Sequence, residues 1–137
     1  MPKKAYFLLS ALTIMCLCLA VGCMRQAQLQ NPKGIPVRSA TGQSLSEAQV
    51  KQAIFAGAKD KGWVARELSP GLITASLAVR NHLAEVEIPY NGTSYSIIYK
   101  SSTNLDYKAK DQTIHNQYNN WVNYLRTAID GRMAEMK

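Results

Sequence analysis

The position of the cysteines constrains this chain more than any other feature of its sequence. Cys16, Cys18 and Cys23 are its only cysteines, and residues 24–137 contain none. A folded domain beyond residue 23 therefore has no disulfide framework and must be held together by a hydrophobic core. Apolar residues make up 47% of the 137-residue chain, which is enough to build the core of one domain of ordinary size.

An apolar segment leads up to the last cysteine. Lys3 and Lys4 give the N-terminus a positive charge, and residues 5–22 are almost all apolar or small. A short basic start followed by an apolar stretch of this length is typical of a secretory signal.

Residues 19–23 read LAVGC and resemble the lipobox of bacterial lipoproteins. In that family a diacylglyceryl group is added to the cysteine thiol, and a peptidase then cuts before this residue. The resemblance implies a signal peptide over 1–22 and lipid attachment at Cys23. One position departs from the pattern, because Ala20 stands where Leu is usual. The alternatives are an ordinary secretory signal, cut at Ala20 or Gly22, and an uncleaved membrane anchor.

The resemblance also bears on location. Met24 follows the cysteine, whereas Asp at this place commonly retains Gram-negative lipoproteins in the inner membrane. For a Gram-negative source, the resemblance implies an outer-membrane lipoprotein whose domain faces the periplasm.

The segment after the cysteine has the composition of a linker. Residues 24–43 contain two prolines, two glycines and several amides, without a sustained apolar period. We predict a lipidated N-terminus and flexible tether over 23–43. The tether's Arg25, Lys33 and Arg38 face either anionic lipid or solvent.

A globular domain is predicted over 44–137. Ser44-Leu45-Ser46-Glu47 matches a capping box, which predicts a helix from Ser44 to about Lys61 with Gly62 as its left-handed C-terminal residue. Apolar residues at three- and four-residue steps predict a second helix from Thr113 to about Met133.

Four strands are predicted between these helices, because apolar and polar residues alternate in this region. Their ranges are 63–68, 72–80, 83–90 and 93–101, and Asn91-Gly92 predicts a tight hairpin turn between the last two. The fold class is therefore α+β. We expect a two-layer sandwich in which both helices cover one face of an antiparallel meander of three or four strands. The opposite, polar face carries Thr74, Ser76, Arg80, Glu85, Glu87, Ser94, Ser96 and Lys100.

Residues suited to catalysis or metal binding are few. His82 and His115 are the only histidines, they are far apart in the sequence, and neither has a companion at ligand spacing. Glu85 and Glu87 share one strand face, which is compatible with an acid–base pair or with a solvated sheet face near Lys100 or Arg80. We predict no catalytic residue, no metal site and no cofactor.

The charge pattern narrows the partners. The formal net charge is +7, and without residues 1–22, which contain Lys3 and Lys4, it is +5, a modest charge that suits a protein near anionic lipid or another polyanion. The basic residues are scattered and not interleaved with aromatics, which argues against a nucleic-acid-binding protein.

The sequence therefore predicts a non-enzymatic periplasmic interaction module, anchored to membrane lipid through Cys23 and binding an envelope protein or polymer. In layout the domain resembles small uncharacterised envelope lipoproteins. The alternative is a ligand-binding module, with a cleft between helices and sheet that takes a small molecule or a cell-wall component.

Overall fold

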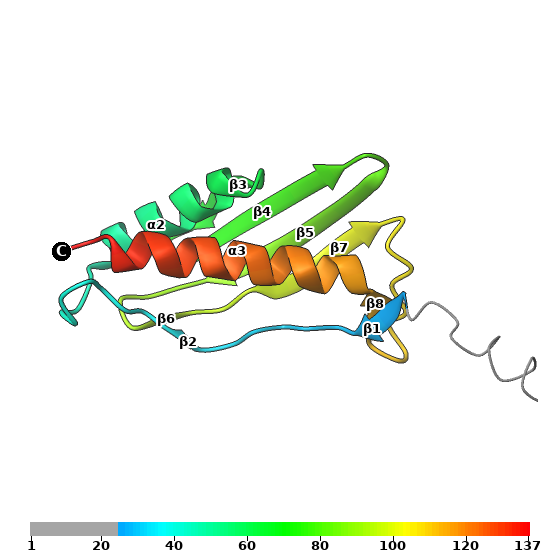
Figure 1. Ribbon diagram of the computed structural model, residues 1–137, viewed down its shortest axis with the longest axis horizontal. Coiled ribbons are helices and arrows are strands. Elements are labelled where there is room, and N and C mark those ends of the chain that lie inside the picture. The colour runs from blue at the N-terminus through cyan, green and yellow to red at the C-terminus, as the bar shows by residue number, and fades with distance from the viewer. Residues whose placement is uncertain (1–24) are drawn as a thin grey trace, which may run out of the picture.

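Two helices lie over one face of an antiparallel sheet in the computed structural model, which describes residues 25–137 (Figure 1). In chain order the elements are β1 (Gln26–Gln28), β2 (Ile35–Pro36), α2 (Glu47–Asp60), β3 (Val64–Ser69), β4 (Leu72–Val79), β5 (His82–Pro89), β6 (Ser94–Tyr95), β7 (Ile98–Thr103), β8 (Thr113–His115) and α3 (Asn116–Ala134). The α+β class and the order helix, strands, helix are confirmed.

The main sheet is a four-stranded antiparallel meander in the order β3-β4-β5-β7. Its centre is the β4–β5 hairpin, in which the pairing runs without interruption from Leu72 opposite Pro89 to Val79 opposite His82. Alternate residues of these strands point to opposite faces. The face beneath the helices is buried, and its central members are Ile73, Ala75, Leu77, Ala84, Val86 and Ile88.

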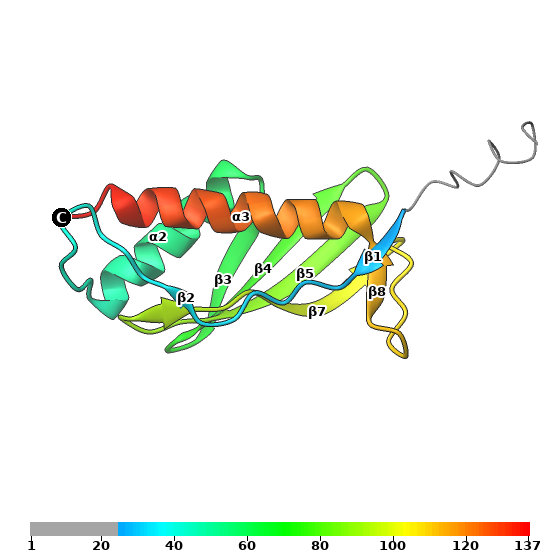
Figure 2. The same cartoon turned by 60° about the horizontal axis from the view of Figure 1, so that its bottom comes forward.

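The helices pack closely against each other as well as on the sheet (Figure 2). Gly57 of α2 meets the backbone of α3, because a Cβ atom built at Gly57 would lie 2.6 Å from the backbone nitrogen of Ile129. Only a glycine permits this approach, since real Cβ atoms do not come so near to backbone. The fully buried Ile54 and Leu125 belong to the same core.

The segment predicted as a flexible tether is part of the fold over its described residues. We call residues 25–37 the strap. It runs along the molecule beside β6, β7 and α3 (Figure 2), and β1 pairs with β8 while β2 pairs with β6. Between these two short strands, the Ile97 amide donates to the carbonyl oxygen of Pro32 at 2.9 Å. The prediction of a flexible tether is therefore wrong for the strap. This segment has the polar composition of a linker, but it is an ordered extended chain.

The side chain of Asn119 fixes the strap to α3. Asn119 is only 6% exposed, which is unusual for a residue with a side-chain amide. Its Oδ1 accepts a hydrogen bond from the Gln30 amide at 3.1 Å, and its Nδ2 donates to the Gln28 carbonyl at 2.8 Å. The side-chain amide thus acts as a strand neighbour would, by satisfying one donor and one acceptor of the strap backbone.

Several predicted boundaries need correction. The first helix is capped by Ser46, whose hydroxyl accepts from the Gln49 amide, so the capping box begins two residues later than Ser44. The second helix begins at Asn116, because residues 113–115 pair with β1 as β8. The strand predicted over 93–101 is split into β6 and β7.

The turn between β5 and β6 is built differently from the prediction. Asn91 and Gly92 do not have positive φ angles. Instead, the Asn91 side chain accepts from the amides of Thr93 and Ser94 at 2.8 and 2.9 Å, which makes the turn an Asx type. The glycine is explained by the close approach of the Leu45 carbonyl, which would lie 3.0 Å from a Cβ at Gly92. Gly62 has the predicted left-handed φ of 77°.

Neither of the two helices within residues 25–137 combines the length and the hydropathy that a membrane span requires.

The two helical glycines give a matched test of the helix contact. We expect Gly57→Ala to lower the free energy of unfolding by about 1–3 kcal/mol, because the new methyl overlaps the α3 backbone. Gly131→Ala should instead raise the free energy of unfolding, by up to about 1 kcal/mol, because alanine is the better helix former and nothing lies within 4 Å of its Cβ. Urea denaturation measures both, and equal effects of the two variants would contradict the close contact.

Two neighbouring asparagines of α3 give a matched test of how the strap is held. Asn119→Ala should cost about 2–3 kcal/mol, because two backbone groups of the strap lose their partners. It should also speed amide hydrogen exchange at Gln30. Asn120→Ala, one residue along on the exposed side of α3, should change the free energy of unfolding by less than about 0.5 kcal/mol. Unchanged exchange at Gln30 in Asn119→Ala would show that the side chain does not hold the strap.

Candidate functional site

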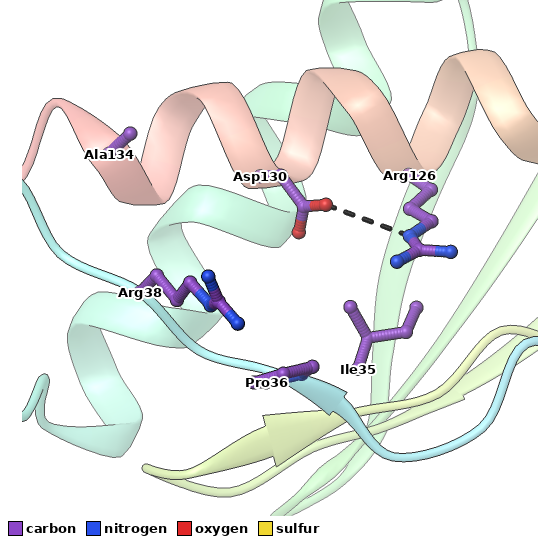
Figure 3. A pocket seen from close by; sticks show the side chains of 6 residues that line it. All are labelled: Ile35, Pro36, Arg38, Arg126, Asp130 and Ala134. Carbon is purple, nitrogen blue, oxygen red and sulfur yellow. Dashed lines mark ion pairs between the residues drawn. The ribbon is translucent and has the colours of Figure 1, made fainter.

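A groove of about 440 Å³ lies between the strap and the C-terminal half of α3. Figure 3 shows how its walls are formed. The strap contributes Ile35 and Pro36, Arg38 follows directly after the strap, and α3 contributes Arg126, Asp130 and Ala134. Its volume falls within the range of small-ligand sites, and its lining combines an apolar floor with charged side chains.

The strap wall is held in place by β2. Ile35 is 4% exposed and pairs with Tyr95 of β6, while Pro36 pairs with Ser94. Proline is tolerated here because β2 is an outer strand of its two-stranded sheet. Beyond β2, the Val37 amide donates to the Thr93 carbonyl at 2.9 Å. These contacts bring Arg38 to the mouth of the groove.

The α3 wall carries a connected set of polar groups. Arg126 and Asp130 stand one turn apart and form an ion pair, with Nε 3.7 Å from Oδ2. The buried Tyr95 donates its hydroxyl hydrogen to Asp130 Oδ1 at 2.6 Å. Burial, together with this hydrogen bond, raises the pKa of Tyr95 well above its usual range. The phenol therefore stays protonated and holds the carboxylate in a fixed orientation.

The groove carries more positive than negative charge. Arg38 forms no ion pair with any residue of the described chain, and its guanidinium points into the gap in Figure 3. Arg126 pairs with Asp130 at the long distance of 3.7 Å, and both side chains remain partly exposed to solvent. Two guanidinium groups facing one engaged carboxylate can bind a carboxylate or phosphate by paired hydrogen bonds.

The two histidines are distant from each other, and neither lines this groove. His82 is the first residue of β5, and its Nδ1 donates to the carbonyl of Asn104 at 2.7 Å. His115 is the N-cap of α3, where its Nδ1 accepts from the Gln117 amide at 3.2 Å. Both side chains therefore have structural partners. Over residues 25–137, no three side chains of the His, Cys, Asp and Glu types come together in a way that fits a metal ion.

The two glutamates lie on the open face of the sheet. Glu85 Oε2 accepts from the Ser101 hydroxyl at 2.5 Å, and Glu87 pairs in register with Thr74. Glu85 lines a shallow hollow of about 240 Å³ with Arg66 and Lys100. Lys100 lies at the bulge where the β5–β7 register shifts.

Cys23, the predicted lipid attachment residue, lies outside the described residues.

Comparisons of this chain with protein-family models, with curated proteins and with solved structures found no match.

The groove was not found by sequence reasoning, although two signals pointed to it. Ile35-Pro36-Val37 is an apolar patch inside an otherwise polar segment, and Arg126 and Asp130 have the four-residue spacing of a helical ion pair. Nothing local indicates that these two stretches, about 90 residues apart, form one groove. Their proximity depends on the strap, whose composition predicts a linker.

Two tyrosines test the polar wall of the groove. Tyr95→Phe should lower the free energy of unfolding by about 1 kcal/mol, because it removes the hydrogen bond to Asp130. Tyr124→Phe, at a residue that is 55% exposed, should have almost no effect.

The cost of Tyr95→Phe should also depend on pH in a defined direction. The folded state raises the pKa of Tyr95 above its ordinary value of 10.0, so the stabilisation is complete below pH 10 and declines as pH rises further. Urea denaturation of wild type and Tyr95→Phe as a function of pH measures this. A difference that grows above pH 10 would contradict the assignment.

Proposed function

We propose that this protein is a membrane-anchored bacterial envelope lipoprotein whose domain is a non-enzymatic interaction module. The observation that carries the proposal is the LAVGC sequence that ends at Cys23, preceded by a basic start and an apolar segment. No cysteine follows, so Cys23 would be the single thiol of the processed chain. An exported chain that keeps one cysteine at its new N-terminus has a use for it as an attachment residue.

The start of the fold supports the same proposal. Arg25 already takes part in the domain, because its carbonyl accepts a hydrogen bond from the Asn116 amide at 2.7 Å. The proposed cleavage before Cys23 therefore leaves every described element intact. Met24 in place of Asp favours the outer membrane for a Gram-negative source.

The groove is the surface we assign to partner binding. It offers an apolar floor and two arginines to an acidic segment of another envelope protein or polymer. The single carboxylate that lines the groove, Asp130, already binds Tyr95 and Arg126, and we assign the groove binding without chemistry.

A second candidate function is the binding of a small molecule or cell-wall component. The groove's volume favours this alternative, and its arginines suit a ligand that bears a carboxylate. The groove lies beside α3 and not between helices and sheet, where facing side chains such as Ile54 and Ile88 are fully buried. Titration of a carboxylate-bearing cell-wall peptide, followed by NMR shifts at Arg126 and Ala134, separates this alternative from a protein partner.

Metabolic labelling with a fatty acid tests the anchor. We expect label on the wild-type protein, and a precursor that keeps its signal peptide when globomycin blocks the lipoprotein peptidase. Cys23→Ser should abolish the label, because the acceptor thiol is lost. Cys18→Ser is the matched control, since this cysteine lies within the proposed signal peptide, and it should leave labelling unchanged. Secretion of Cys23→Ser with label retained, or of wild type without label, contradicts the proposal.

A further inference from the structure

One end of the molecule gathers the start of the strap and two loops that are distant in sequence. The β1–β8 pair, the segment over residues 104–112 and the turn of the β4–β5 hairpin all lie at this end (Figure 1, right). Hydrogen bonds tie them together. Gln28 Nε2 donates to the Gln112 carbonyl at 2.9 Å, and Asn104 Nδ2 donates to the Asn81 carbonyl of the hairpin turn at 2.7 Å. We call Arg25, the hairpin turn and residues 104–112 the basal end.

The basal end carries unpaired positive charge. Its charged residues are Arg25, Arg80, Lys108, Lys110, Asp106 and Asp111, all exposed. Four cations against two carboxylates leave a net charge of +2. None of the six forms an ion pair within the described part of the chain, where Lys51, Arg126 and Arg132 are the basic residues that do so. Cations left free on one end are available to an anionic partner.

The basal end is also where the chain leads to Cys23. Met24 alone separates Cys23 from Arg25, and two residues of fully extended chain reach about 7 Å. The strap beyond Arg25 is fixed by hydrogen bonds to Asn116, Gln112 and Asn119. A lipid on Cys23 would therefore hold the basal end within a few ångströms of the headgroups.

We propose that the basal end lies directly on the anionic headgroup surface of the membrane that holds Cys23, so that the domain stands on the bilayer in one orientation. This inference rests on the proposed lipidation. The exposed cations contact lipid phosphates, and the strap takes the place of a tether. Since α3 rises 1.5 Å per residue, Arg126 and Ala134 lie about 15 and 27 Å along the helix from Asn116. The groove is thereby held away from the membrane and open to the periplasm.

A membrane fits this surface better than a protein does. The large apolar side chains that are exposed in the described chain are Val64, Leu68 and Tyr124, and none belongs to the basal end. Protein interfaces have cores enriched in aromatic residues and depleted in lysine. Anionic lipid, by contrast, attracts lysine and arginine near its surface without any apolar contact.

The test uses the lipidated, processed chain (residues 23–137) in vesicles of phosphatidylcholine and phosphatidylglycerol that contain a spin-labelled headgroup quencher. A fluorophore is placed on Ala109→Cys in the basal end, or on Thr41→Cys in the loop after β2, at the opposite end of the molecule (Figure 1). Each introduced thiol is the only free one, because Cys23 carries the lipid and Cys16 and Cys18 leave with the proposed signal peptide. We expect strong quenching at residue 109 and little at residue 41.

Charge reversal supplies the matched comparison. Lys108→Glu with Lys110→Glu should lower the ratio of membrane-seated to unseated domain by about fivefold per lysine, and quenching at residue 109 should fall. Lys59→Glu with Lys61→Glu makes the same change at two exposed lysines at the C-terminal end of α2, outside the basal end, and quenching should stay as in the unmodified protein. The mass of the purified chain shows beforehand whether Cys23 is lipidated.

Each result decides the question. Quenching confined to residue 109 and sensitive only to the basal lysines supports the proposal. Equal quenching at residues 109 and 41 in a chain with the lipid mass overturns the fixed orientation and leaves lipidation standing. A chain that lacks the lipid mass and does not bind vesicles overturns both proposals.

Discussion

The two hydrogen bonds of the Asn119 side chain fix the position of the strap, and the other functional features depend on that position. The strap has few residues that face a core of their own, so a side-chain amide on α3 and short pairings with β6 and β8 must hold it. Once held, it brings Ile35, Pro36 and, directly after the strap, Arg38 against α3 and creates one wall of the groove. A buried amide with both of its hydrogen-bonding groups satisfied contributes specificity at small energetic cost, whereas an unsatisfied one would be expensive.

The strap also determines how freely a lipid-anchored domain could move relative to the membrane. A coil of about 20 residues would let a domain sample many orientations above a bilayer, at an average separation of roughly 25 Å. The structure replaces that coil with backbone hydrogen bonds that begin at Arg25. Under the proposed lipidation, membrane attachment and domain orientation become a single constraint, because a lipid on Cys23 and the folded chain are separated by one residue.

The sheet and helices could be predicted because their signals are local and periodic. The alternation over residues 72–90 identified the β4–β5 hairpin and its buried face, and the residues expected to face inward, such as Ile73, Val86 and Ile88, are fully buried. The strap and the groove could not be predicted in this way. Extended chain that bonds to the sequence-distant residues Gln112 and Asn119 leaves no period, and an asparagine on a helix gives no sign of whether its amide meets solvent or backbone.

The distribution of ion pairs separates surfaces that stabilise the fold from surfaces left for partners. Arg132 binds both carboxylate oxygens of Asp60, at 2.7 and 2.8 Å, and so joins α3 to the end of α2; its guanidinium holds the pKa of that carboxyl below its usual range. Lys51 and Glu67 similarly join α2 to β3 at 3.1 Å. Charges at such joints have intramolecular partners, whereas Arg38, the basal lysines and other exposed basic residues of the described chain, such as Arg66 and Lys100, form no ion pair. A bare exposed cation contributes little to folding, so these side chains stay available to anionic groups. Under the two proposals those groups are an acidic partner at the groove and anionic lipid at the basal end.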